Sequence, residues 1–316
     1  MEFRTEIKGI SGDRSIDYDS SILLLGSCFS QEIGSKLKEF QFNSLSNPYG
    51  VIFHPLAIER LLNDTVHKKT YSQSDLTEHD GLWCSLFHHS DFNNEDAELV
   101  ISNLNSEREK TAEFLKRATH IFITLGTAWA YQWESTGAFV ANCHKIPQKR
   151  FEKKLLSLEE ISSSLSNSID LIRQLNPSVK IIFTVSPVRH LKDGFRENQI
   201  SKSLLHLGIE SVLDLSDTYY FPAFEIVQDD LRDYRFYAND MVHPSDQAVA
   251  YIWSLLYSHW FAPSCDPVLK KVSSINRTLA HRPNHPDSKK HRDLIKRTRS
   301  DLEELTSQYP HMTWAK

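Results

Sequence analysis

The feature that most constrains this chain is a short, wholly apolar run that ends at a glycine and a serine. Residues 22–25 (ILLL) lead directly into Gly26 and Ser27, and a helix-like stretch follows. A run that is apolar at every position is typical of a strand buried on both faces of a parallel sheet. Open α/β folds place their chemistry at the carboxyl edge of such a sheet. The sequence therefore predicts that the Ser27 hydroxyl lies at this edge.

Two more short apolar runs, with a helix between them, indicate the fold class. Residues 121–125 and 181–185 resemble the first run in length and hydrophobicity. Ser157 and Glu160 form a capping-box pattern at the start of a helix whose apolar face contains Ile161, Leu165, Ile169 and Ile172. Strand, crossover helix and parallel strand are the elements of a doubly wound sheet. We therefore expect an α/β fold of three layers with a mostly parallel central sheet.

Length and composition agree with one large domain and a C-terminal extension. The chain has 316 residues, of which 40% are hydrophobic, and it lacks an apolar run of the roughly 20 residues that a membrane helix needs. Its first residues do not resemble a signal peptide, and its four cysteines are scattered as in reduced proteins. We therefore expect a cytoplasmic protein with a domain over residues 1–262 and an extension over residues 263–316.

Charge distinguishes the extension from the rest of the chain. The net charge is −5, but residues 264–316 contain eleven lysines and arginines and only six acidic residues. The remaining residues are acidic overall, which argues against nucleic-acid binding. Residues 289–305 have a helical pattern with a broken apolar stripe of Leu294, Ile295, Leu302 and Leu305. Two interpretations remain open for this extension, a solvated appendage and a site for a partner or an anionic surface.

Asp240 and His243 provide an acid and a base three residues apart, followed by Pro244. A turn of this length can fold the carboxylate back to the Nδ1–H of the imidazole and leave Nε2 free. A serine becomes nucleophilic when such an imidazole accepts its proton. The order Ser27, Asp240, His243 therefore predicts a catalytic triad. Cys28 is the rival nucleophile, because neighbouring side chains diverge after a strand and only one of them can face the cleft.

A set of ordered motifs links the chain to a known family. Residues 26–30 (GSCFS) resemble the signature of the GSCFA family, with Ser30 at the position of the alanine. Family-like segments follow as NPYG at 47–50, TLGTAW at 124–129, ANCHK at 141–145, VSPVRH at 185–190, YFP at 220–222, LRDYRFY at 231–237 and DMVHPS at 240–245. This family is a bacterial branch of the SGNH/GDSL hydrolases. The resemblance implies an SGNH-like (flavodoxin-like) α/β/α fold, an acyl-serine intermediate on Ser27, and no cofactor.

The same resemblance implies an oxyanion hole made of the Ser27 amide, a glycine amide and an asparagine side chain. Gly50 matches the glycine, although it also suits an ordinary turn. Ala128 stands where the asparagine of the family's Gly-x-Asn-Asp block belongs. Asn142 and Asn47 are the candidate replacements. Losing one such donor typically costs on the order of a hundredfold in turnover, so this departure affects efficiency rather than reaction type.

Candidate substrate-binding residues follow the predicted strands. Arg189 comes after the strand at 181–185 and is placed to recognise an acidic or sugar-bearing substrate, and Trp129 follows the strand at 121–125. An aromatic cluster suits either a sugar-stacking wall or, more commonly, core packing; it contains Tyr219, Tyr220, Phe221, Phe224, Tyr234, Phe236 and Tyr237. The adjacent His88 and His89 lack the spacing of zinc ligands, so we expect no metal site.

Together these patterns predict a serine esterase that hydrolyses or transfers a short acyl group. The leading substrate is an O-acetyl group on a carbohydrate, although the fold itself does not choose among esters. The alternatives are a catalytically silent binding module that keeps the fold, and an interaction protein that works through its basic tail. We expect the partner to be a small-molecule or glycan ester, with no nucleic acid and no membrane span.

Overall fold

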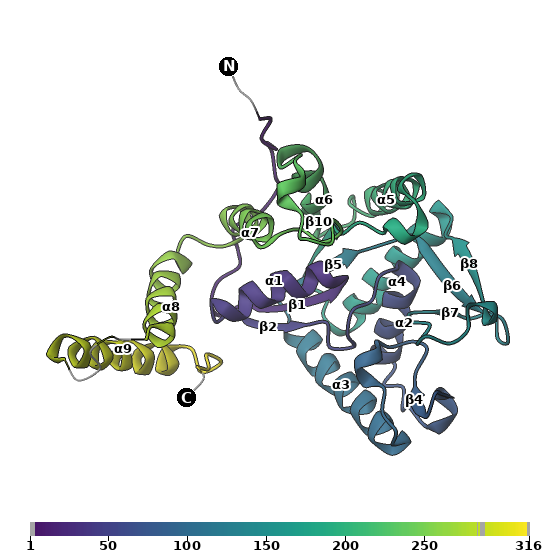
Figure 1. Ribbon diagram of the computed structural model, residues 1–316, viewed down its shortest axis with the longest axis horizontal. Helices are drawn as coiled ribbons and strands as arrows, with labels where there is room; N and C mark the ends of the chain where they lie inside the picture. The colour runs from purple at the N-terminus through teal and green to yellow at the C-terminus, as the bar shows by residue number, and fades with distance from the viewer. Residues whose placement is uncertain (1–3, 283, 285–287, 315–316) are drawn as a thin grey trace.

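The protein is built around a sheet of five parallel strands in the order β10-β9-β5-β1-β2 (Figure 1). The computed structural model describes residues 4–282, 284 and 288–314. The strands are β1 (Ser21–Gly26), β2 (Asn43–Ser46), β5 (His120–Leu125), β9 (Lys180–Val185) and β10 (Thr218–Tyr220). The three apolar runs recognised in the sequence are β1, β5 and β9, which are adjacent in the sheet.

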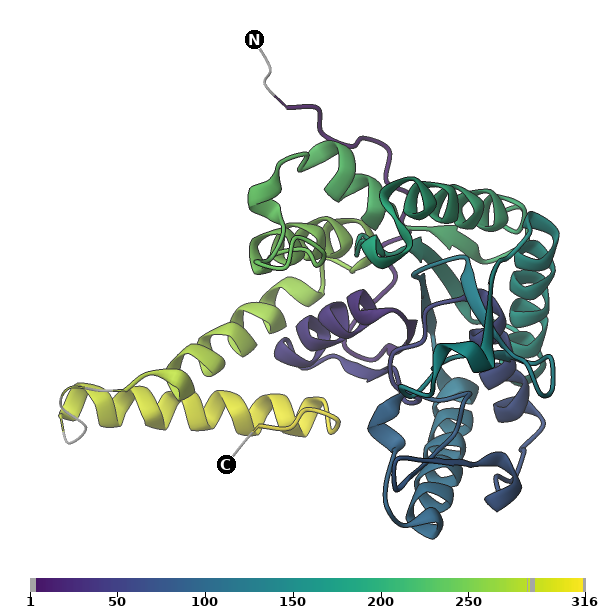
Figure 2. The same cartoon turned by 45° about the vertical axis from the view of Figure 1, so that its right-hand side comes forward.

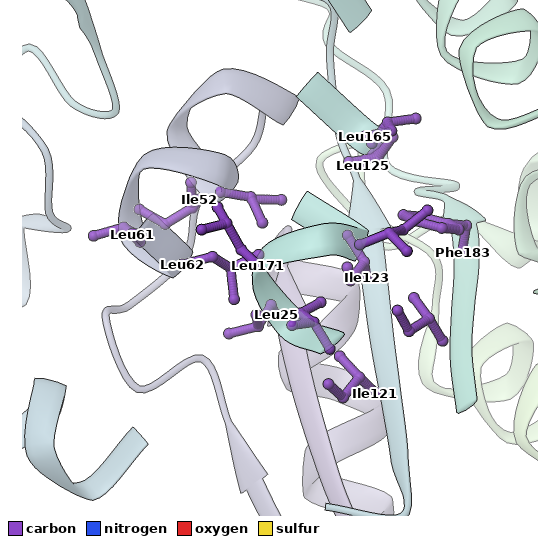
Figure 3. Packing of buried hydrophobic residues seen from close by; sticks show 14 of the residues in the cluster. Leu25, Ile52, Leu61, Leu62, Ile121, Ile123, Leu125, Leu165, Leu171 and Phe183 are labelled. Carbon is purple, nitrogen blue, oxygen red and sulfur yellow. The ribbon is translucent and has the colours of Figure 1, made fainter. Parts of the chain in front are cut away.

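Side chains alternate between the two faces of the sheet, and helices cover both. Leu23 and Leu25 belong to one core, part of which is seen in Figure 3, while Ile22 and Leu24 belong to the other. The first core is covered by α2 (Pro55–Val66), α3 (Ala97–Arg117), α4 (Leu158–Leu175) and α5 (Phe195–Glu210). The second is covered by α1 (Cys28–Glu39) and α7 (Asp246–Trp260). These three layers confirm the predicted α/β class.

Helix α4 begins with the capping box that the sequence predicted. Ser157 N donates to Glu160 Oε2 at 2.8 Å, and Glu160 N donates to Ser157 Oγ at 3.2 Å. The two bonds satisfy amides that a helix start otherwise leaves unpaired. The helix ends at Asn176, whose side chain donates to the carbonyls of Leu115 and Ala118 and so fixes the entry into β9.

Shorter strands, a short helix and several turns lie outside the main sheet. Strands β3 (Thr77–His79) and β4 (Leu82–Cys84) form a hairpin, and β6 (Trp129–Trp133), β7 (Phe139–Val140) and β8 (Phe151–Leu155) form an antiparallel sheet. A short helix, α6 (Ala223–Glu225), continues into a π-turn at Ile226–Asp230. Single 3-10 turns lie at Gln73–Asp75, Ser90–Phe92, Gln148–Arg150, Leu191–Asp193 and Tyr234–Phe236.

The C-terminal extension is a helical hairpin that projects from the sheet domain (Figure 2). It consists of α8 (Cys265–Ala280) and α9 (Lys289–Gln308), so the helix expected over 289–305 is present. Leu305 is buried, whereas Leu294 is 43% exposed, in agreement with incomplete packing. The hairpin returns to the end of α1, where His311 Nε2 lies 3.1 Å from Gln41 O. Within the described residues, none of the helices is both long and apolar enough to span a membrane.

Candidate active site

A tight turn joins β1 to α1 at the carboxyl edge of the sheet. Gly26 ends β1 with a φ of +132°, and a Cβ at this position would collide with the backbone oxygen of Thr124 in β5. Glycine is therefore required there by both conformation and space. The next amide, that of Ser27, donates to the same Thr124 oxygen at 3.0 Å. The turn thus places the first residues of α1 directly at the end of the sheet.

Ser27 is the N-cap of α1. Its hydroxyl accepts a hydrogen bond from Phe29 N at 3.3 Å, and the residue has no exposed surface. This is the usual structural role of a serine that precedes a helix. The sequence analysis expected the Ser27 hydroxyl to face His243 and the Ser27 amide to bind an oxyanion. In the structure, the hydroxyl accepts a hydrogen bond from Phe29 N and the amide donates to Thr124 O of β5, so both expectations stay predictions.

Cys28, the first residue of α1, faces His243 instead. Its Sγ atom lies 3.4 Å from Nε2 of His243, and the residue is half-buried. Nδ1 of His243 lies 2.7 Å from Oδ2 of Asp240, the contact that the turn pattern predicted. An imidazole that donates its Nδ1 proton to a carboxylate has a free acceptor at Nε2, so this atom can accept the thiol proton. The structure thus aligns a thiol, an imidazole and a carboxylate.

The Asp240 carboxylate is held by the loop that it shares with His243. Oδ1 accepts the amide of Val242 at 2.9 Å and that of His243 at 3.0 Å, and Ala238 N donates to His243 O at 2.8 Å. The His243 amide and ring, with the Val242 amide, lower the pKa of Asp240 to about 2. Asp240 is therefore charged at neutral pH, and it can orient and stabilise a protonated imidazole.

The thiol of Cys28 is protonated at rest. Burial raises the pKa of Cys28 above its ordinary value. The amides at the start of α1 and the positive charge of Lys202 act in the opposite direction but do not overcome burial. The thiol therefore needs His243 to remove its proton before it can attack an electrophile.

Lys202 is a buried charged residue near the site that the sequence analysis did not identify. It lies on α5, and its Nζ donates to Gly126 O at 2.6 Å and to Ser186 O at 2.7 Å, just beyond the ends of β5 and β9. Burial lowers the pKa of Lys202 to about 7. The sequence carries no signal for it, because a lysine is normally exposed; in the structure, four buried residues recur at helical spacing along this helix: Asn198, Lys202, Leu205 and Ile209. That spacing places the lysine on the core face.

His190, which follows β9 in the family-like segment at 185–190 and was expected with Arg189 to recognise a substrate, lies close to Lys202. Its ring lies against Gly126 and edge-on to Phe53, and its Nε2 is buried without a hydrogen-bond partner among the described residues. Burial, with the charges of Lys202 and His243, lowers the pKa of His190 to about 3. The ring is therefore neutral and belongs to the same electrostatic cluster as His243.

The three other expected oxyanion donors, Asn47, Gly50 and Asn142, each make a different contact. Asn47 lies beside the turn at Gly26 and Ser27, where its Nδ2 donates to Ser27 O at 3.4 Å. The Gly50 amide donates to Asn47 O at 2.8 Å, so it closes a turn. Asn142 holds its own loop, because its Oδ1 accepts His144 N at 2.9 Å. Neither of the last two contacts involves the turn at Gly26 and Ser27. Cys28 begins α1, and amides at a helix N-terminus favour a negative charge.

The two expected substrate-binding residues, Arg189 and Trp129, lie in different parts of the structure. Arg189 packs on the loop at residues 240–243, because its backbone N donates to Val242 O and its Nη1 donates to Met241 O, each at 3.1 Å. Trp129 begins β6, and its Nε1 donates to Glu197 O of α5 at 3.4 Å. The structure therefore places Arg189 next to the proposed base and fixes Trp129 against a helix.

Comparisons with known proteins give a family match and distant structural likenesses. The sequence model of the GSCFA family matches residues 21–255, and that of the GSCFA domain protein, C-terminal domain, matches residues 272–316. No curated protein matches the sequence.

Two solved structures are similar to this chain at low identity. A carbohydrate esterase family 3 protein from Talaromyces cellulolyticus is 10% identical with a TM-score of 0.36, over 79% of this chain and 98% of that chain. An acetyl xylan esterase from the rumen bacterium Butyrivibrio proteoclasticus is 11% identical with a TM-score of 0.39, over 77% of this chain and 64% of that chain.

Proposed function

The chain belongs to the GSCFA family, and on this premise we propose that it hydrolyses or transfers short acyl esters through a covalent acyl-enzyme. The observation that carries the proposal is the alignment of Cys28, His243 and Asp240, with contacts of 3.4 Å and 2.7 Å. Acyl transfer requires a nucleophile, a base that takes its proton, and a group that orients the base. The resemblance of the sequence to SGNH hydrolases supports the same type of reaction.

In the first step, His243 Nε2 accepts the thiol proton while Sγ of Cys28 attacks the carbonyl carbon of the ester. A C–S bond forms, and the electrons of the carbonyl double bond move to the oxygen. The amides at the N-terminus of α1 favour this negative charge. The oxyanion then collapses, the C–O bond to the alcohol breaks, and His243 returns the proton to the leaving oxygen. The products are a free alcohol and a thioester on Cys28.

In the second step, water attacks the thioester carbonyl while His243 accepts one of its protons. The C–S bond breaks, the carboxylic acid leaves, and the proton on His243 restores the thiol. If a sugar hydroxyl replaces water, the same steps yield a new ester, and the protein acts as an acyltransferase. Asp240 stabilises the imidazolium in both steps, because its carboxylate stays charged beside Nδ1.

Ser27 is the alternative nucleophile, since the order of the sequence motifs favours it. Its hydroxyl caps α1 and is fully buried, so it has to leave its bond with Phe29 N before it can meet an ester. The thiol of Cys28 needs no such rearrangement. We therefore prefer Cys28 as the nucleophile.

We further propose a short acyl group, with O-acetyl carbohydrates as the leading substrate class, and a cytoplasmic location in a bacterium. A catalytic thiol has to stay reduced, as thiols do in the cytoplasm, and all four cysteines of the protein are free.

The test is to trap the acyl-enzyme on the full-length protein. After brief reaction with p-nitrophenyl acetate and an acid quench, peptide mass spectrometry locates the added acetyl group. We expect it on Cys28, and we expect neutral hydroxylamine to remove it, because thioesters are cleaved faster than oxygen esters. An acetyl group on Ser27 establishes the alternative nucleophile. A protein that shows neither acylation nor turnover is a silent binding module.

A further inference from the structure

A polar groove opens beside the catalytic loop, which consists of residues 240–243. Its volume is about 310 Å³, and its walls include Arg189, Phe195, Arg232, Tyr234 and Tyr237. These residues come from the loop after β9, the start of α5 and the segment that precedes Asp240. The volume is at the small end of the roughly 300–1,000 Å³ of ligand pockets, which suits one or two sugar rings.

The groove and the catalytic loop share Arg189. Its backbone N and its Nη1 bond the carbonyls of Val242 and Met241, the two residues between Asp240 and His243. A ligand in the groove therefore lies against the loop that positions the base.

The groove carries more positive than negative charge. Arg189 and Arg232 are its cations, and Arg232 has no hydrogen bond or ion pair within residues 4–282, 284 and 288–314. Asp233 is the acid in its wall, but its carboxylate accepts Arg235 N at 2.9 Å and lies 3.9 Å from Arg235 Nε. Two guanidinium groups near one another bind a carboxylate well, because each offers donors in a planar fork.

Aromatic rings line the same groove. Phe195 and Tyr234 are each 67% exposed, which is unusual for large aromatic side chains. The guanidinium of Arg189 stacks 5.4 Å from the Phe195 ring and 5.1 Å from the Tyr237 ring, so the arginine is held between them. Exposed rings give flat apolar platforms with low conformational cost, and the C–H face of a sugar ring packs on such platforms.

We propose that this groove binds a sugar that carries a carboxylate, such as a uronic acid, and delivers an ester on that sugar to Cys28. The guanidinium groups recognise the carboxylate, and the rings hold the sugar. This inference rests on the proposed function, and it narrows the substrate from acyl esters in general to esters of acidic sugars.

The kinetic test compares two acetylated sugars that differ in the carboxylate, an O-acetylated methyl glucuronoside and an O-acetylated methyl glucoside. We expect kcat/KM of the full chain to be about tenfold or more higher for the glucuronoside. Arg232→Gln should bring the ratio of the two kcat/KM values close to one, and Arg232→Lys should restore part of it. The control is Arg196→Gln, an arginine of α5 that is 81% exposed, pairs with Glu197 and lies outside the groove wall. This control should keep the full ratio.

A binding measurement keeps the inference testable if the protein proves to be inactive. Calorimetry with free glucuronate, glucose and inorganic phosphate is done on the wild-type protein and on Arg232→Gln. We expect binding of glucuronate that weakens about tenfold or more in Arg232→Gln and is unchanged in Arg196→Gln. Equal affinity for glucuronate in wild type and Arg232→Gln, or tighter binding of phosphate than of glucuronate, overturns the groove assignment. Absence of turnover with glucuronate still bound overturns the proposed function alone.

Discussion

Sγ of Cys28 lies 3.4 Å from Nε2 of His243, while the hydroxyl of the preceding residue, Ser27, caps the helix that Cys28 begins. Two neighbouring side chains therefore differ in position. One caps α1, and the other holds a thiol next to an imidazole. Alanine substitutions of these two side chains should therefore have different effects on activity and on stability.

We predict that Cys28→Ala lowers turnover of p-nitrophenyl acetate by on the order of a thousandfold or more, because the acceptor of the acyl group is gone. Ser27→Ala should lower the free energy of unfolding by about 1 kcal/mol, the usual cost of losing an N-cap, and should keep most of the activity. Initial rates and urea unfolding of both variants measure these effects. An active Cys28→Ala beside a folded, inactive Ser27→Ala would reverse the assignment.

Asp240→Asn tests the orienting carboxylate. The amide cannot stabilise the imidazolium, so turnover should fall by on the order of a thousandfold or more while the fold is retained. Asp246→Asn is a matched control, because Asp246 is an exposed acid a few residues away in the first turn of α7. Steady-state kinetics of both variants give the comparison. Wild-type turnover of Asp240→Asn would place the orienting acid elsewhere.

Buried neutral histidines should make the protein sensitive to acid. Burial lowers the pKa of His54 and His120 to about 4 and that of His88 and His190 to about 3, from an ordinary 6.5. Between these values the unfolded chain binds more protons than the folded one, so the stability contribution is complete above pH 6.5 and is lost as the pH falls towards 4 and 3.

His54→Asn isolates one of these contributions. His54 caps α2, since its Nδ1 accepts Ala57 N at 3.2 Å, and asparagine keeps a capping oxygen without a proton to gain. Urea unfolding from pH 7.5 to 4.5 should give a shallower loss of stability in this variant than in the wild type. Identical slopes would show that the ring of His54 is not neutral in the folded protein.

Lys202 should make the stability of the protein depend on pH in the alkaline range. Burial lowers its pKa from 10.5 to about 7, so its stability contribution is complete above pH 10.5 and is lost as the pH falls through 7. Urea unfolding should therefore show the stability of the wild-type protein rising from pH 7 to 10, and Lys202→Met should lack this rise, because methionine has no proton to lose. Equal pH dependences in the two proteins would show that Lys202 is not a neutral buried amine.

The C-terminal hairpin should depend on one buried leucine. Leu305 is 1% exposed within the second core, so Leu305→Ala should cost about 2–5 kcal/mol of unfolding free energy. Leu294 lies on the same helix but is largely exposed, and Leu294→Ala should change the stability by less than about 0.5 kcal/mol. Chemical denaturation of the two variants makes the comparison. Similar small effects would mean that the hairpin unfolds separately from the sheet domain.

The central strands and α4 could be predicted from the sequence because their signals are local. Residues 22–25 form an apolar run, and Ser157 and Glu160 form a capping box, whatever lies around them. The strand at Asn43–Ser46 has a polar sequence and gives no such signal. It is a strand because its backbone pairs with Ser21 and the residues that follow in β1. Pairing across the fold overrides the weak local preference there.

The choice between Ser27 and Cys28 could not be made from the sequence, because it depends on the direction in which α1 leaves the sheet. The pairing of Asp240 with His243 could be predicted, since a three-residue turn contains both partners. The burial of Lys202 could not be predicted from the sequence either. A lysine is normally exposed, and only the carbonyls of two distant strand ends make its burial possible.

Lys202 also has a mechanical consequence. The carbonyls of Gly126 and Ser186 lie beyond the last paired residues of β5 and β9, and Nζ of Lys202 bonds both of them. If α5 withdrew from the sheet, two carbonyls and an amino group would lose their partners in a buried setting, which is costly. Phe195 begins the same helix and forms a wall of the groove. Lys202 therefore anchors α5, the helix that begins with Phe195 of the groove wall, to the ends of β5 and β9.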